Sequence, residues 1–222
     1  MKKFLIIFFS IFLLTSLTTF NPNYFDIGFQ FFKIKKIEIK NLKVLDKKKI
    51  KNLFYKELSG SSLFILDEKK IDKILNSNEL IDYVEFKKIY PSKLQIIVYE
   101  KETIAIINFK QSTFYLTKNG EEIEFFNNKI LEKLPNIFGK QNNFLEVYSA
   151  LTQLTFPISE IKSFYHFDIG RWDIILNNNK VIKLPIKDFI SSLKNYMELH
   201  KKINFEKYSV FDYRIKDQLI LN

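Results

Sequence analysis

The side chains that could do chemistry are few and scattered in this chain. Cysteine is absent and only two histidines occur, His166 and His200, which excludes a thiolate nucleophile, a disulfide framework and most histidine-built metal sites. No G-x-S-x-G turn presents a nucleophilic serine. Five glycines are too few for a glycine-rich phosphate cradle. The sequence therefore predicts a protein that is not an enzyme and that uses no cofactor, metal ion or small-molecule substrate.

The remaining polar candidates have simpler structural interpretations. His166 lies among aromatic residues on an expected strand, which favours a structural histidine. Asp212 and Arg214 flank Tyr213 on one face of another expected strand, so we expect ion pairing or a role in shaping a binding edge. Trp172, the only tryptophan, is expected in the core.

Composition describes a folded protein with a basic surface. Of 222 residues, 46% are hydrophobic and 27% are charged, which excludes a disordered chain. The formal net charge is +10, and all but two of the 35 basic residues are lysines spread over every segment. This spread is typical of a solvated face rather than a nucleic-acid surface, so no nucleic-acid partner is expected.

The N-terminal segment predicts the compartment. Two lysines precede the apolar run Phe4–Phe20, and no charged residue follows before Asp26. We expect a cytoplasmic tail at residues 1–3 and a transmembrane helix at 4–22. Lysines before the run place the N-terminus in the cytoplasm and the rest in the periplasm, as a single-pass protein of the inner membrane. A cleaved signal peptide is the alternative, but no A-x-A-like site closes the run.

After a short linker, residues 33–102 predict a small α+β domain. Ile37 and Ile39 alternate with charged residues, as in a half-buried strand. Asp46 and Asp67 are N-cap candidates for two helices. The order predicted is β-α-(β)-α-β-β, with the short central strand at Leu63–Leu66. The last two strands are expected around residues 84–86 and 94–98, joined by a turn at 90–92.

Residues 103–222 predict a mainly antiparallel β domain with a few helices. Strands are expected at residues 104–109, 114–116, 163–169, 171–176, 181–184, 208–213 and 215–221. Helical spacing predicts a helix over 143–154, with Leu145, Tyr148 and Leu151 on one side. A second helix over 187–201 has an apolar stripe of Phe189, Ile190, Leu193, Tyr196 and Met197. The fold class expected for the whole chain is α+β, behind the N-terminal helix.

Several short motifs, in order along the chain, resemble one known family. The segments are Ile37–Leu42, Ser61–Asp67, Val84–Ile96, Leu134-Pro135 with Gly139, Trp172–Leu184 and Phe211–Arg214. Together they resemble a POTRA domain (residues 33–102) followed by a β domain (103–222), as in the bacterial cell-division family FtsQ/DivIB. The sequence departs from the family pattern in its three-residue tail, in lysines that replace arginines, and in Asn41 where glycine is usual.

The resemblance implies a non-enzymatic scaffold of the divisome in the inner membrane. Such a scaffold recruits other division proteins, of the FtsB and FtsL type, to the septum through its periplasmic domains, and self-association stays open. The resemblance also implies that a partner is held by strand addition at the last strand. The corresponding residues here are Arg214, Ile215, Lys216, Asp217, Gln218, Leu219, Ile220 and Leu221.

Backbone hydrogen bonding supports a partner-binding edge here independently of the resemblance to the family. A terminal strand leaves a row of backbone N–H and C=O groups that a partner strand can satisfy. In an extended strand over Ile215–Leu221, Ile215, Leu219 and Leu221 point one way and Lys216, Gln218 and Ile220 the other. Alternatives are an edge covered within its own domain, an anchored periplasmic adaptor or enzyme unrelated to division, and a POTRA-type outer-membrane assembly or secretion component.

Overall fold

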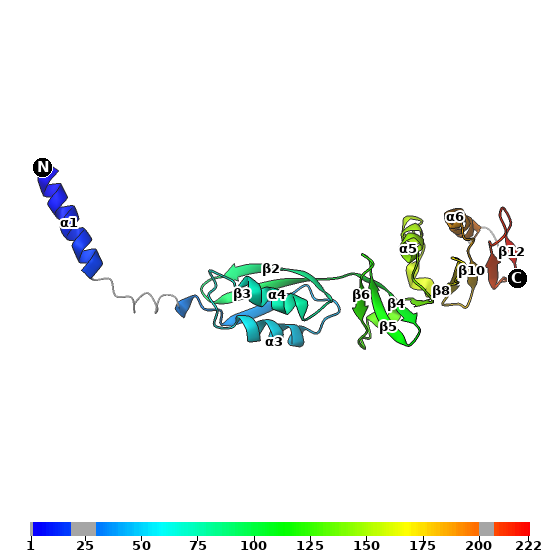
Figure 1. Cartoon of the computed structure of the whole chain (residues 1–222), viewed down its shortest axis with the longest axis horizontal. Coiled ribbons are helices and arrows are strands. Elements are labelled where there is room, and N and C mark those ends of the chain that lie inside the picture. Colours follow the sequence, from blue (N-terminus) through cyan, green and yellow to red (C-terminus); the bar gives the residue numbers. More distant parts are fainter. Residues whose placement is uncertain (1, 19–29, 200–206) are drawn as a thin grey trace. The chain divides into compact units, whose positions relative to one another are not determined.

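The computed structural model describes residues 2–18, 30–199 and 207–222 (Figure 1). The chain divides into two compact units, Met1–Tyr99 and Glu100–Asn222. Each unit has its own cluster of buried apolar side chains. Strands and helices occur in both units, so the expected mixed α+β class is confirmed.

Helix α1, Lys2–Thr18, is apolar after its two lysines, and its large side chains from Phe4 to Leu14 are exposed. Within the described residues, no helix has both the length and the apolar character needed to cross a membrane. The transmembrane helix expected over 4–22 is therefore not found: α1 ends at Thr18, and residues 19–22 lie outside the described part.

The first unit is a three-stranded sheet with two helices. Its elements are β1 (Lys36–Lys40), α3 (Lys47–Leu58), α4 (Glu68–Asn76), β2 (Ile81–Ile89) and β3 (Lys93–Glu100). The strand order is β1-β3-β2, with β1 parallel to β3. The short strand expected at Leu63–Leu66 is not formed; an isolated bridge between Lys33 and Ser62 takes its place. The chain there is held by Leu63 N–H, which donates to Phe32 O at 2.8 Å.

Both helices of this unit begin where the sequence places an aspartate. The Asp46 carboxylate accepts a hydrogen bond from Lys49 N at 2.8 Å, and that of Asp67 accepts one from Lys69 N at 3.1 Å. These bonds satisfy N–H groups that the helix itself leaves unpaired. The apolar faces then close over the sheet. The buried core comprises Ile34, Ile37, Ile39, Ile50, Phe54, Leu58, Leu63, Ile74, Ile81, Leu94, Ile96 and Val98.

The second unit contains a nine-stranded sheet among its described residues. Its strands are β4 (Thr103–Phe109), β5 (Ser112–Thr117), β6 (Glu122–Glu124), β7 (Asn136–Phe138), β8 (Ile161–His166), β9 (Trp172–Leu176), β10 (Val181–Lys183), β11 (Val210–Asp212) and β12 (Ile220–Leu221). Their order is β12-β11-β10-β9-β8-β7-β4-β5-β6. Three neighbouring pairs are parallel (β4–β7, β7–β8 and β10–β11) and the others are antiparallel.

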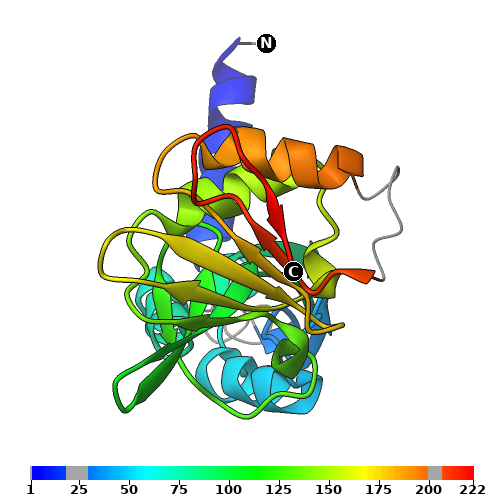
Figure 2. The ribbon, with the colours of Figure 1, turned by 90° about the vertical axis from the view of Figure 1, so that its right-hand side faces the viewer.

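Helices α5 (Phe144–Gln153) and α6 (Phe189–Leu199) lie beside each other on one face of this sheet (Figure 2). Two short 3-10 turns, Leu131–Lys133 and Ile158–Glu160, complete the unit. Helix α5 buries Phe144, Val147, Ala150 and Leu151. Its expected face was therefore wrong in part, since Leu145 is exposed and Tyr148 is half-buried.

The rotation of α5 follows from its first residue. Phe144 places its ring against Phe164 and Trp172, at centroid distances of 5.0 and 5.5 Å. Residues 144, 147 and 151 share helical spacing just as 145, 148 and 151 do, so the larger buried ring decides between them. In α6, Leu193 and Tyr196 are buried as expected, but Ile190 is 53% exposed and leaves the expected stripe.

Candidate partner-binding edge of the nine-stranded sheet

Strand β12 forms one of the two edges of the sheet, and β6 forms the other. Strand β12 pairs with β11 in antiparallel register, Phe211 opposite Leu221 and Asp212 opposite Ile220, and with no other strand of the described residues. Asn222 N–H donates to Val210 O at 3.2 Å, and Val210 N–H donates to Asn222 O at 2.9 Å. Because such bonds alternate along an antiparallel pair, the N–H and C=O of Leu221 turn to the open side.

The strand is shorter than the sequence predicted. A turn occupies residues 215–218, closed by Gln218 N–H, which donates to Ile215 O at 3.2 Å. Asp217 has a left-handed backbone with φ 59°, a conformation that aspartate tolerates better than most residues. The strand expected over Ile215–Leu221 was therefore wrong in extent, and only Ile220 and Leu221 of the eight candidate binding residues lie in β12.

The expected alternation of side chains holds from Leu219 to Leu221 and fails at Ile215 for the same reason. Leu219 and Leu221 pack against the core of the unit. Ile215, expected on their side, stands in the turn and is 51% exposed. Ile220 faces away from the core and is 41% exposed. The open edge thus presents one apolar side chain beside the outward backbone groups of Leu221.

Arg214 and Asp212 form the ion pair that was expected as one option. Asp212 is 7% exposed and accepts Arg214 Nε at 2.8 Å and the backbone N–H of Arg214 at 3.0 Å. The hydrogen bonds from Arg214 hold the pKa of the Asp212 carboxyl below its usual range. The pair fixes the chain at the point where it leaves β11 for the turn.

A second aspartate–arginine pair lies two strands away and was missed from the sequence. Arg171 Nε bonds Asp173 Oδ1 at 3.1 Å, and the Arg171 guanidinium also lies 4.1 Å from the centre of the Phe167 ring. Burial raises the pKa of Asp173 in spite of its partner. The signal was present, because arginine and aspartate are two residues apart here as they are at 212 and 214.

A groove runs beside the edge, between the N-terminal half of α6 and the turn. Its wall on the helix includes Phe189, Ile190 and Asn195, and its wall on the turn includes Tyr213, Ile215 and Leu219. Tyr213 Oη donates to Asn195 Oδ1 at 3.1 Å, which ties the two walls together. Ile190 and Ile215 are both more than half exposed, so apolar side chains of the groove are reachable from solvent, beside charged ones such as Lys194 and Lys216.

The histidine and tryptophan that the sequence singled out lie inside the second unit. Trp172 is buried, as predicted, and its ring lies 4.6 Å from that of His166. The Nδ1 atom of His166 is buried without a hydrogen-bond partner, and desolvation lowers the pKa of this imidazole. Within the described residues, no group of three acidic, histidine or cysteine side chains could hold a metal ion. His200 lies outside the described residues.

The geometry defines a two-unit protein: a small β-α-α-β-β unit, then a mixed sheet whose last strand is open beside an apolar groove. Residues 32–101 match the family model described as "POTRA domain, FtsQ-type", and residues 105–214 match "Cell division protein FtsQ/DivIB, C-terminal". The chain therefore belongs to the FtsQ/DivIB family of bacterial cell division proteins. The match ends at Arg214, before β12.

Curated relatives agree with this family. The chain is 29% identical over 184 residues to the cell division protein FtsQ of Rickettsia bellii, covering 80% of this chain and 64% of that protein. It is 24% identical to FtsQ of Rhizobium meliloti (71% and 52% covered) and 30% identical to the cell division protein DivIB of Clostridium botulinum (68% and 56%). The chain thus spans less than two thirds of the length of these relatives.

One solved structure is similar over part of the chain. It is the major extracytoplasmic domain of the trans isomer of the cell division protein DivIB from Geobacillus stearothermophilus. The identity is 15%, and the match covers 48% of this chain and 99% of that one. The TM-score of 0.29 is too low for a comparison of the two folds.

Proposed function

We propose that this chain is a non-enzymatic scaffold of the bacterial division machinery that binds another division protein by strand addition beside β12. Membership of a family of cell division proteins supports the process. The open terminal strand supports the mode of binding, and it is the observation that carries the proposal. Proteins of the FtsB and FtsL type are the partners we propose.

The contact would use backbone and side chains for different purposes. The N–H and C=O of Leu221 would pair with the incoming strand, which supplies affinity without regard to sequence. Ile220 and the groove between α6 and the turn would take apolar side chains of the partner, which supplies selectivity. A partner would therefore offer a short strand followed or preceded by an apolar side chain.

The place of action is part of the same proposal. The apolar run Phe4–Phe20, with two lysines before it, would hold the chain at the inner membrane with both units on the periplasmic side. The domains would be those the sequence predicts, a POTRA domain at 33–102 and a β domain at 103–222. Membrane residence is checked by alkaline extraction of membranes, and orientation by protease treatment of intact spheroplasts.

A proline substitution tests strand addition directly. Leu221→Pro removes the outward N–H and leaves the hydrogen bonds between Asn222 and Val210 in place. Leu221→Ala is the matched control, because it shortens the same side chain and keeps the N–H. We expect partners of the FtsB and FtsL type to co-purify from membrane extracts with the alanine variant and the parent chain, and to be lost with the proline variant.

Two results would contradict the proposal at different levels. Equal recovery of the same partners with Leu221→Pro would rule out strand addition, provided that thermal unfolding shows the variant folded. Normal division in cells depleted of the chain would rule out the division role itself. The variant Ile130→Glu changes an exposed isoleucine of the same unit that is remote from the edge. It should leave the recovery of the partners unchanged.

A further inference from the structure

An exposed cluster of aromatic and aliphatic side chains lies on the first unit, away from the edge described above. We call it the aromatic patch; it consists of Phe31, Phe32, Phe64, Ile65 and Tyr90. The Phe32 ring lies 4.7 Å from that of Phe64 and 6.0 Å from that of Tyr90. Ile65 is 79% exposed, the largest exposed fraction among the large hydrophobic side chains of the described residues. Phe31, Phe64 and Tyr90 are also exposed.

The patch is held in place by backbone hydrogen bonds. Ile34 N–H donates to Ser61 O at 2.9 Å and Gly60 N–H donates to Ile34 O at 3.0 Å, which joins the two segments that carry the phenylalanines. Lys88 Nζ donates to Phe64 O at 2.6 Å and ties the third segment to them. Folding thus holds these apolar rings in fixed positions at the surface. Packing of the core does not require them to be exposed there.

The chemistry around the patch is that of a bilayer interface. The three segments that form it, residues 30–36, 61–66 and 87–93, contain six lysines and no aspartate or glutamate, although Asp67 directly follows the second segment and Glu38 pairs with Lys93. Aromatic rings prefer the headgroup region of a bilayer, and lysines extend their ammonium groups towards anionic lipids. An acidic protein surface could bind the same lysines equally well. The choice between a lipid and a protein partner therefore depends on the position of the patch in the chain.

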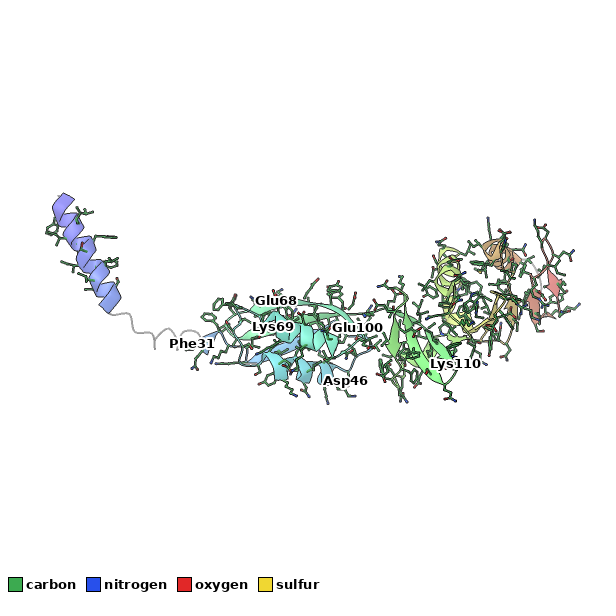
Figure 3. The ribbon with its side chains drawn as sticks, in the orientation of Figure 1. Phe31, Asp46, Glu68, Lys69, Glu100 and Lys110 are labelled. Atoms are coloured by element: carbon green, nitrogen blue, oxygen red, sulfur yellow. The ribbon has the colours of Figure 1, made fainter. Side chains whose placement is uncertain are left out.

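Along the chain, the patch begins 13 residues after Thr18, the last residue of α1. Phe31 lies at one end of the first unit, opposite the end that carries Asp46 and Glu100 (Figure 3). The chain between Thr18, the last residue of α1, and Gln30 can span at most about 40 Å when fully extended. A surface that binds the exposed apolar side chains of α1 at its C-terminal end therefore lies within about 40 Å of Gln30, next to the patch.

We propose that the aromatic patch rests in the headgroup region of the same bilayer that holds α1, and so fixes which end of the first unit faces the membrane. This inference rests on the membrane residence proposed above. Ile65 and Phe31 would enter the interface, while Lys33 and Lys88 meet the phosphates of anionic lipids. The occupant is a lipid surface, not a second protein.

The absence of cysteine makes the test simple, because each introduced cysteine can be labelled alone. The full chain is reconstituted in vesicles of phosphatidylethanolamine and phosphatidylglycerol, with a polarity-sensitive fluorophore at one of three positions. Ile65→Cys reports on the patch and Phe8→Cys on α1. Lys48→Cys, in the first turn of α3 beside Asp46, is the matched control at the far end of the unit. Nitroxide-bearing lipids then quench any label that lies in the bilayer.

We expect the labels at Ile65 and Phe8 to shift to the blue and lose most of their emission to nitroxide lipid, and the label at Lys48 to stay unquenched. A quenched Phe8 label with an Ile65 label that behaves like Lys48 overturns the inference and keeps the membrane tether. An unquenched Phe8 label with a quenched Ile65 label overturns the tether, and with it the inference that the patch and α1 share one bilayer. If neither is quenched, both fail.

Discussion

The guanidinium of Arg214 closes on the carboxylate of Asp212, with Nε 2.8 Å from Oδ1 and Nη2 2.5 Å from Oδ2. Arg171 and Asp173 repeat the arrangement on β9 in the reverse order. Lys183, on the strand between them, stands in register with both aspartates. Two carboxylates and three cations therefore lie together at one end of the three strands next to the open edge.

Replacing Asp212 should change how the free energy of unfolding depends on pH in the acid range. Its folded pKa lies below the unfolded value because Arg214 bonds the ionised form, so its contribution is present above about pH 4 and is lost as the pH falls through the folded pKa. We expect Asp212→Asn to lower the free energy of unfolding at pH 7 by about 1 kcal/mol, since Arg214 is half in solvent. Denaturant unfolding of both proteins at pH 7 and pH 3 should show a smaller difference in free energy at the lower pH.

Asp173 should behave in the opposite sense. Burial raises its folded pKa, so ionisation at neutral pH costs stability, and that cost is relieved as the pH falls through the folded pKa. Relative to Asp173→Asn, the parent chain should therefore gain stability between neutral pH and about pH 4. The same unfolding series measures it, and a parallel loss in both aspartate variants would contradict the opposed signs.

Gly139 is required by a close backbone approach. Its φ is +94°, and a Cβ there would stand 2.5 Å from the carbonyl oxygen of His166. We expect Gly139→Ala to destabilise the second unit by at least about 2 kcal/mol, from the left-handed backbone and the clash together. Gly60→Ala is the matched control, because its φ is +76° with nothing within 4 Å of the added methyl, and it should cost only about 1 kcal/mol. Thermal unfolding compares the two.

The groove beside the edge should contribute to partner binding without supporting the fold. Ile190 is 53% exposed on its wall, so Ile190→Ser should change the free energy of unfolding by less than about 0.5 kcal/mol. If the partner fills the groove, the same change should weaken its binding about tenfold, or 1.4 kcal/mol. Ile130→Ser, at an isoleucine 56% exposed outside the groove, is the control. Titration of a labelled partner measures both, and equal affinities would contradict the groove's role.

Local chemistry could be predicted from the sequence where one residue decides the outcome. Asp46 and Asp67 cap their helices as expected, because an N-cap needs only the aspartate and the N–H groups that follow it. The face of α5 could not be predicted in the same way. Two sets of apolar residues share its spacing, and the choice depends on Phe144 meeting Phe164 and Trp172 from other elements.

The candidate edge was predicted in place but not in extent. An alternating pattern over residues 215–221 cannot reveal the left-handed backbone of Asp217, which turns the chain before β12 begins. The groove was missed for a different reason. Its two walls come from segments far apart in the sequence, which the hydrogen bond between Tyr213 and Asn195, 18 residues apart, joins. That binding occurs there stays a prediction.

From β7 onward, the strands lie side by side in the sheet in the same order as in the chain, β7-β8-β9-β10-β11-β12. Each strand after β7 therefore pairs with the strand that precedes it in the chain. A partner strand that pairs with β12 would extend the sheet at the same edge and in the same direction as the strands of the chain itself.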